Sequence, residues 1–125
     1  MKIIKLQNNY KDLRGSISDI LYKKKIKHIS LIVSNKGAIR GNNYFKKNVQ
    51  YIFNLSSPFE YWYKKLGSKK KPKRILVKKN DLLFTPKLEI HVSKFMKKNK
   101  LLEFSTLSYK EKKKFKDSTR YILIK

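Results

Sequence analysis

Residues 37–57 read GAIRGNNYFKKNVQYIFNLSS, and the spacing of a few side chains in this stretch decides the expected fold. Five residues separate Gly37 from Asn43, one residue separates Asn43 from Phe45, and four residues separate Phe45 from Gln50. Alternate residues of a β-strand point to the same face of a sheet. We therefore expect Asn43 and Phe45 to project to the same face of one strand.

A second stretch, NDLLFTPKLEIH at residues 80–91, carries a related spacing. Five residues separate Asn80 from Pro86, and four residues separate Pro86 from His91. We expect Gln50 and His91 to arrive from neighbouring strands and to complete a cluster of four side chains with Asn43 and Phe45.

Short segments rich in Ile, Val, Phe and Tyr recur between turn residues, a pattern typical of a β-sandwich or β-barrel. No repeat or long linker divides the chain, so residues 1–125 are expected to form one domain. A short basic helix is expected over Ser108–Asp117, where Ser108 and Glu111 form a capping-box pattern. The predicted class is all-β with a short C-terminal helix. The expected strands are Ile17–Leu21, His28–Ser34, Val49–Leu55, Glu60–Lys64, Arg74–Val77, Leu82–Thr85, Ile90–Phe95, Lys100–Thr106 and Tyr121–Ile124.

Composition excludes several classes of protein. Hydrophobic residues make up 40% of the chain, which is too high a share for a disordered protein. There is no Cys, so disulfides and thiolate metal sites are excluded. The first residues, MKIIKL, lack the apolar stretch of a signal peptide, and no run approaches membrane-spanning length. We therefore expect a cytoplasmic protein that does not enter a membrane.

The net charge of +25 has two interpretations. Such a field attracts nucleic acid, anionic lipid or a phosphorylated ligand. Alternatively, it reflects a coding bias toward Lys and Asn, because Lys far outnumbers Arg, the residue usually used for bidentate phosphate recognition. The densest charge run, Lys69–Arg74, contains Pro72 and is expected to be a solvated loop between two strands.

Both stretches resemble the motifs of the cupin family. The first cupin motif runs Gly, five residues, His-x-His, three or four residues, Glu, six residues, Gly. The second runs Gly, five residues, Pro, x, Gly, two residues, His. Every spacing is kept in this chain, and Gly37, Pro86 and His91 match by identity. The resemblance spans residues 12–106 and implies a single cupin-type jelly-roll β-barrel whose interior the cluster of four side chains faces.

Metal-binding cupins hold their ion with three His and one Glu. This chain has only one of these four ligands, a His. Asn43 and Phe45 stand for two of the His, Gln50 stands for the Glu, and His91 remains. Neutral amides are poor ligands for zinc or iron. We therefore expect no metal and no other cofactor. His91 is interpreted either as a core imidazole satisfied by Gln50 or Asn43, or as a proton donor or hydrogen-bonding group for a ligand.

Two runs that contain Arg-Gly indicate which group of cupins the chain resembles. AIRGNNYFKK at residues 38–47 is similar to the Arg-Gly-x-His-x-His-Lys run of cupins in nucleotide-sugar and surface-polysaccharide biosynthesis. DLRGSI at residues 12–17 is similar to the Asp-x-Arg-Gly start that such enzymes share. They include ketoisomerases of thymidine-diphosphate 4-keto-6-deoxyhexoses and the related 3,5-epimerases. The resemblance implies a nucleotide-sugar ligand of the thymidine-diphosphate type and, as often in this group, a homodimer.

The resemblance also implies roles for single residues. Arg40 matches an Arg that helps to hold the anionic part of the ligand. Arg14 matches an Arg that in the epimerases approaches the nucleotide, in some cases that of a neighbouring subunit. Asn43 occupies the position of the base, a role that needs a group titrating near neutral pH, as His does and Asn cannot. The expected ligand-binding residues are Arg14, Arg40, Asn43, Phe45, Lys46 and Gln50.

If catalysis persists, other side chains must carry the proton. His91 is one candidate, and either Glu60 or Glu89 could supply a carboxylate to the pocket. Tyr61 or Tyr63 could donate the proton back if it faces inward. The expected catalytic residues are therefore His91, Tyr61 and Tyr63.

Three functions remain open at this point. The first is a sugar-nucleotide isomerase or epimerase of surface-polysaccharide synthesis, which is active by altered chemistry or only binds. The second is a non-enzymatic basic β-barrel that binds nucleic acid or another polyanion, which would need Lys and aromatic side chains gathered on one face. The third is an inactive subunit that supports an active paralogue.

Overall fold

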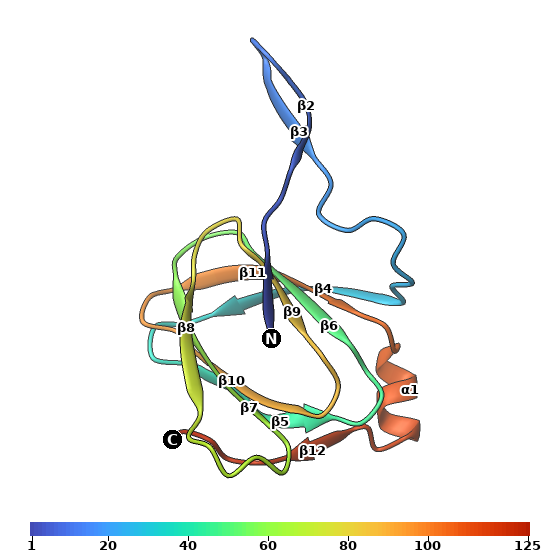
Figure 1. The fold of residues 1–125 in the computed structure, drawn as a ribbon, viewed down its shortest axis with the longest axis vertical. Helices are drawn as coiled ribbons and strands as arrows, with labels where there is room; N and C mark the ends of the chain where they lie inside the picture. Colours follow the sequence, from blue (N-terminus) through green and yellow to red (C-terminus); the bar gives the residue numbers. More distant parts are fainter.

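The computed structural model describes residues 1–125 as two five-stranded antiparallel sheets, a two-stranded hairpin and one short helix (Figure 1). The predicted all-β class with a C-terminal helix is confirmed. No helix has the length and apolar character needed to cross a membrane. The elements are β1 (Lys2–Ile4), β2 (Asn8–Asp12), β3 (Gly15–Ser18), β4 (His28–Ser34), β5 (Ile39–Phe45), β6 (Gln50–Asn54), β7 (Phe59–Lys65), β8 (Lys73–Val77), β9 (Leu82–Thr85), β10 (Glu89–Lys94), β11 (Asn99–Ser105), α1 (Tyr109–Lys114) and β12 (Ser118–Arg120).

The two larger sheets face each other and enclose the interior of a jelly roll. One sheet has the strand order β1-β9-β6-β11-β4, and the other has the order β12-β5-β10-β7-β8. From β4 to β7 the chain changes sheet at every step, and it changes again between β8 and β9, between β9 and β10 and between β10 and β11. Because successive strands lie in opposite sheets, residues that are close in sequence line opposite walls of the interior.

Apolar side chains fill one part of the space between the sheets. Phe59, Tyr61, Val77 and Leu83 are fully buried there and belong to the main core cluster. A second cluster lies on the outer face of β6, around Tyr51 and Phe53 and their neighbours, and the segment that leads into β4 covers it. Strand β6 is therefore buried on both faces.

The hairpin of β2 and β3 stands away from the barrel (Figure 1). Its strands pair only with each other, and most of its side chains are exposed. The strand expected over Ile17–Leu21 is therefore placed wrongly. Only residues up to Ser18 pair in the hairpin, while Ile20 and Leu21 pack on the second core cluster.

The strand expected over Tyr121–Ile124 is also wrong. The C-terminal strand is β12, which pairs with β5. Beyond it, the backbone N–H of Tyr121 donates a hydrogen bond to the carbonyl of Asn42, and Oδ1 of Asn42 accepts hydrogen bonds from the backbone N–H groups of Leu123 and Ile124.

The C-terminal helix is confirmed with the expected start. Ser108 is the N-cap of α1, and its hydroxyl accepts a hydrogen bond from the backbone N–H of Glu111. The Glu111 carboxylate in turn accepts one from the backbone N–H of Ser108. This reciprocal pairing satisfies two N–H groups that the first turn leaves free.

Candidate functional site

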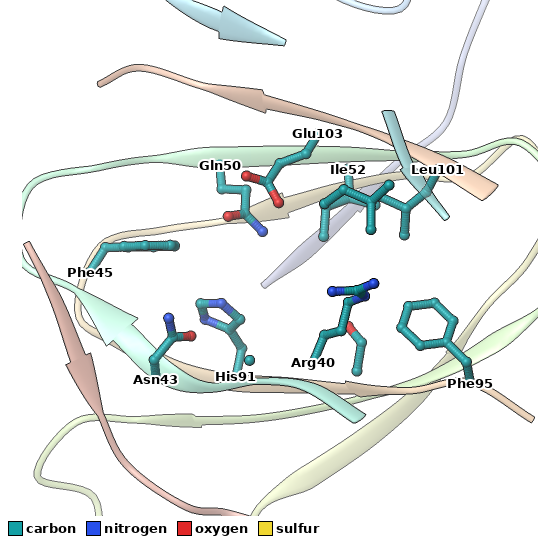
Figure 2. A pocket seen from close by; sticks show the side chains of 12 residues that line it. Arg40, Asn43, Phe45, Gln50, Ile52, His91, Phe95, Leu101 and Glu103 are labelled. Carbon is teal, nitrogen blue, oxygen red and sulfur yellow. The ribbon is translucent and has the colours of Figure 1, made fainter. Parts of the chain in front are cut away.

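A cavity of about 160 Å³ lies between the two sheets and is open at one side (Figure 2). Five strands supply most of its lining, so it is the interior of the barrel rather than a surface groove. Both sheets contribute apolar and polar side chains: Ile32, Ile52, Phe95 and Leu101 are among the apolar ones, and Asn43, Gln50, His91 and Glu103 are among the polar ones. The lining residues are Ile32, Arg40, Gly41, Asn43, Phe45, Gln50, Ile52, His91, Ser93, Phe95, Leu101 and Glu103.

The four side chains predicted from the motif spacing all line this cavity. Asn43 and Phe45 share one face of β5, and His91 is the partner of Asn43 in the neighbouring strand β10. Gln50 belongs to β6 in the opposite sheet, not to a neighbouring strand, and it faces the others across the cavity (Figure 2). The predicted cluster is therefore present, but it spans both walls.

His91 is held in one tautomer. Its side chain is buried, and its Nδ1 lies 3.1 Å from the carbonyl oxygen of Glu89. A carbonyl oxygen only accepts hydrogen bonds, so Nδ1 carries the proton and Nε2 carries a lone pair. The ring packs between Phe45, at 5.6 Å, and Tyr61, at 6.0 Å between ring centroids.

Burial lowers the pKa of His91 below its ordinary value, because desolvation penalises the charged imidazolium. His91 is therefore neutral at neutral pH. With its donor used by Glu89, the ring offers the cavity a hydrogen-bond acceptor that can take up a proton.

Asn43 offers a second acceptor beside it. Its Nδ2 donates a hydrogen bond of 2.7 Å to Oγ of Ser118 on β12. Its Oδ1 is buried and has no hydrogen-bond partner in the chain. An unpaired buried acceptor is costly, so this oxygen is available to a hydrogen-bond donor of a ligand.

Arg40 lies at the more exposed end of the cavity. Its Nε donates a hydrogen bond of 2.8 Å to Oγ of Ser34, and its Nη2 donates one of 3.0 Å to the carbonyl of Val33. These two bonds fix the plane of the guanidinium, and they leave Nη1 free for a ligand. Such a fixed cation suits an anionic group at the entrance.

Glu103 also lines the cavity, and the sequence analysis missed it. It lies on β11 and is on the same wall as Gln50 (Figure 2). Neither of the two carboxylates considered from the sequence enters the cavity. Glu60 forms an ion pair with Arg74, and Glu89 accepts a hydrogen bond from the hydroxyl of Tyr61.

The two tyrosines expected to be catalytic do not line the cavity. Tyr61 and Tyr63 both point inward from β7 and stack on each other at 5.8 Å. Tyr61 is fully buried, and its hydroxyl is bonded to Thr85 and Glu89. Desolvation raises the pKa of Tyr61 well above its ordinary value, so the group stays protonated. Its place behind His91 makes it a support for the imidazole ring.

Two of the expected ligand-binding residues lie outside the cavity. Lys46 is exposed after the end of β5. Arg14 lies in the turn of the projecting hairpin, where it forms an ion pair of 2.8 Å with Asp12 and its side chain is 84% exposed. Within one chain, therefore, Arg14 does not reach the barrel interior.

No protein-family model matches this chain, and a search of curated proteins finds no match. Solved structures do match it. A 3,4-ketoisomerase from Helicobacter canadensis is 24% identical, with a TM-score of 0.77 over 95% of this chain and 89% of the other. A His-to-Asn mutant of the 3,4-ketoisomerase QdtA from Thermoanaerobacterium thermosaccharolyticum, in complex with TDP-4-keto-6-deoxyglucose, is 22% identical, with a TM-score of 0.75 over 95% and 86%. The rmlC epimerase of Mycobacterium tuberculosis is 13% identical, with a TM-score of 0.70 over 86% and 63%.

The chain has the cupin fold. The expected jelly-roll barrel is confirmed, and the sheet order explains why two short motifs far apart in sequence meet in one cavity. At these identities the likeness concerns the fold alone.

The cupin cavity of this chain does not fit a metal ion. No group of three or more His, Cys, Asp or Glu side chains lies close enough together to hold one. His91 and Glu103 are the two strong donors in the lining, and the remaining polar groups include neutral amides. We therefore derive no chemical step through a metal.

One signal in the sequence could have pointed to Glu103. The chain has only 8 acidic residues, and this one interrupts the otherwise apolar run Leu101–Phe104. A carboxylate in the middle of an apolar strand is rarely buried without a partner. Alternation places Glu103 on the same face as Leu101, but which wall that face lines depends on the strand order.

Proposed function

We propose that this cupin binds a thymidine-diphosphate-linked keto-sugar and moves the keto group between neighbouring ring carbons. The observation that carries the proposal is His91, a neutral imidazole of fixed tautomer whose free Nε2 faces a cavity in the barrel. This arrangement can take up and return a proton at a sugar hydroxyl. The reaction would take place in the cytoplasm, the compartment expected from the sequence.

The size and polarity of the cavity support this ligand class. At about 160 Å³ it is well below the roughly 300–1,000 Å³ of pockets that enclose a drug-sized molecule. It would therefore hold the sugar ring and leave the nucleotide outside. The free Nη1 of Arg40 at the exposed end would meet the diphosphate, and Asn43 and His91 would accept hydrogen bonds from ring hydroxyls.

The neighbouring structures support the same choice. Two of those described above are 3,4-ketoisomerases, and one is in complex with TDP-4-keto-6-deoxyglucose. Their TM-scores of 0.75 and 0.77 exceed the 0.70 of the epimerase. We therefore choose isomerisation over epimerisation, and the context would be the synthesis of a surface polysaccharide.

Calorimetric titration with TDP-4-keto-6-deoxyglucose at raised salt tests the proposal. Raised salt screens the diffuse attraction of a +25 protein for any anion. We expect saturable binding of the sugar nucleotide, at least about tenfold tighter than that of inorganic polyphosphate. Replacing Arg40 by Ala should weaken it by about tenfold or more, because a charged hydrogen bond is worth about 1.5–3 kcal/mol.

A matched control is Arg74→Ala, which removes an equal charge outside the cavity. It should leave the affinity within about threefold. The sugar-nucleotide proposal would be contradicted by one result: polyphosphate and the sugar nucleotide bind equally well, raised salt abolishes the binding, and Arg40→Ala does not affect it.

A homodimer is the assembly we propose for this function. The outer face of edge strand β4 exposes three apolar side chains in a row, with Ile29 at 61%, Leu31 at 59% and Val33 at 41% exposure. None of the 33 Lys and Arg residues lies in this strand, although exposed edge strands are commonly protected by charge. A second copy would cover the stripe with the same apolar surface, as a two-fold interface requires.

Replacing Leu31 by Glu is expected to convert the dimer to a monomer in sedimentation-velocity experiments. The substitution places one buried charge from each copy close to the two-fold axis. Leu76→Glu is the matched control, because Leu76 on β8 is 41% exposed outside β4. A monomeric wild type, or a Leu31→Glu variant that stays dimeric, would contradict the proposed interface.

A second candidate function rests on the basic surface. Five lysines gather around one hollow between β7 and β8, namely Lys64, Lys65, Lys70, Lys71 and Lys73. This cluster would bind nucleic acid or another polyanion through its phosphates, with an affinity that falls steeply with salt. In the titration above, this candidate predicts the outcome in which polyphosphate binds as well as the sugar nucleotide.

A further inference from the structure

The carboxylate of Glu103 faces His91 across the cavity (Figure 2). Glu103 pairs with Ser30 of β4 on one side and with Ile52 of β6 on the other, so it lies in the interior of its sheet. Its side chain is 19% exposed and lines the cavity. Burial of an acidic group is costly, so a carboxylate in the interior of a sheet is expected to have a binding partner or a function.

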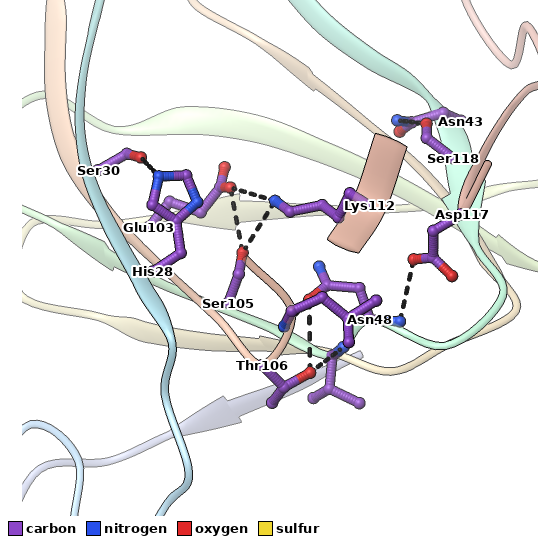
Figure 3. A network of polar contacts seen from close by, with 12 residues as sticks. His28, Ser30, Asn43, Asn48, Glu103, Ser105, Thr106, Lys112, Asp117 and Ser118 are labelled. Carbon is purple, nitrogen blue, oxygen red and sulfur yellow. Dashed lines mark hydrogen bonds and ion pairs between the residues drawn. The ribbon is translucent and has the colours of Figure 1, made fainter. Parts of the chain in front are cut away.

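Neighbours on one side hold this carboxylate in place (Figure 3). Oγ of Ser105 donates a hydrogen bond of 3.4 Å to Oε1 of Glu103. Nζ of Lys112, from α1, lies 4.0 Å from the same oxygen and donates to Oγ of Ser105 at 3.3 Å. Both contacts of the carboxylate involve Oε1, so Oε2 has no partner in the chain and is free for a ligand.

The carboxylate and the imidazole belong to opposite walls. Glu103 lies on the sheet that contains β6 and β11, and His91 lies on the sheet that contains β5 and β10. Figure 2 shows Glu103 and Gln50 on one side of the cavity and His91 and Asn43 on the other. A sugar ring between them would contact two groups able to carry protons, one at each wall.

We propose that Glu103 is the base that removes the carbon-bound proton of the keto-sugar and returns it to the neighbouring carbon. This inference rests on the function proposed above. In this assignment His91 transfers the proton between the two sugar oxygens, a role that suits the fixed acceptor Nε2. Proton transfer would thus be carried by two groups on facing sheets, the motif residue His91 and Glu103.

The steps balance without another reactant. Glu103 takes the proton from the carbon next to the keto group, and the electrons of that C–H bond form a C=C bond while the keto oxygen takes up negative charge. Nε2 of His91 takes the hydroxyl proton from the carbon that Glu103 has deprotonated and gives it to the former keto oxygen. The oxygen that lost its proton becomes the new carbonyl, and Glu103 returns its proton to the former keto carbon. Both side chains end as they began.

Deuterium exchange tests this assignment. Wild-type protein and Glu103→Gln are incubated with TDP-4-keto-6-deoxyglucose in D₂O, and deuterium at the ring carbons is followed by NMR. We expect the variant to lose exchange and turnover by at least about 100-fold, as removal of a general base does. Its calorimetric Kd for the same compound should stay within about threefold. Glu103→Asp keeps the carboxylate but shortens the side chain, and it should lose at least tenfold in exchange.

Glu60→Gln is the matched control, because Glu60 lies outside the cavity and pairs with Arg74. It should keep wild-type exchange. Exchange by Glu103→Gln within about threefold of wild type would overturn this inference and leave the proposed function standing. A wild type that does not bind the compound, or that binds it without exchange and turnover, would overturn the proposed function and this inference with it.

Discussion

Replacing His91 by Asn is expected to lower turnover of TDP-4-keto-6-deoxyglucose by at least about 100-fold, the usual contribution of a positioned acid–base group. Asn keeps a polar side chain of similar length but cannot take up a proton. Binding should change little, because Asn43 and Arg40 remain. Steady-state kinetics and calorimetry on the same preparations separate the two effects.

The pH dependence of the wild type provides a second readout. His91 acts in its neutral form, and burial lowers its pKa below the ordinary 6.5. Activity should therefore stay constant as the pH falls to 6.5 and decline only below that value, as the imidazole becomes protonated. The chain's other histidine, His28, does not line the cavity, so His28→Asn should keep the wild-type profile. A His91→Asn variant with wild-type turnover would contradict the assignment.

Replacing Gly41 by Ala is expected to destabilise the protein by about 3 kcal/mol or more, a large part of the roughly 5–15 kcal/mol that holds a domain folded. Gly41 has a φ of +105°, which side-chain-bearing residues rarely adopt. A Cβ there would lie 2.8 Å from the carbonyl oxygen of His91 and 3.1 Å from Cα of Val92. Both atoms belong to the backbone of β10, so the clash cannot be relieved by a side chain.

Gly37→Ala separates the clash from the backbone strain. Gly37 also has a positive φ, of +86°, but a Cβ there would meet nothing within 4 Å. It should cost about 1–2 kcal/mol from the unfavourable φ alone. Urea unfolding followed by the fluorescence of Trp62 measures both variants. Equal losses for the two glycines would show that β5 and β10 are not as closely packed at Gly41 as the structure has them.

Much of the fold followed from the sequence because strand alternation is a local property. The spacing of Asn43 and Phe45 was enough to place both side chains on one face of a strand, and the resemblance to the cupin motifs implied that this face, with His91, lines the barrel. The expected strands His28–Ser34 and Leu82–Thr85 match β4 and β9 at both ends. In these segments, turn residues and apolar pattern agree on the same boundaries.

Other features depended on which strands face each other. Alternation places Glu103 on the face of β11 that also carries Leu101, but only the strand order sets that face opposite His91. Tyr61 points inward as its position allows, yet its hydroxyl is bonded to Thr85 and Glu89 away from the cavity. Alternation cannot distinguish a buried side chain from one that lines a cavity.

The sequence by itself determined the all-β class, the cupin-like spacing and the lack of a metal-binding set of His and Glu at the motif positions, because these depend on residue identity and on the period of a single strand. The tertiary structure alone decided that the Glu103 carboxylate lies on the wall opposite His91, and that Arg14 lies outside its own barrel. Such facts depend on sheet order and on the path of a hairpin, which arise from packing between segments far apart in the chain.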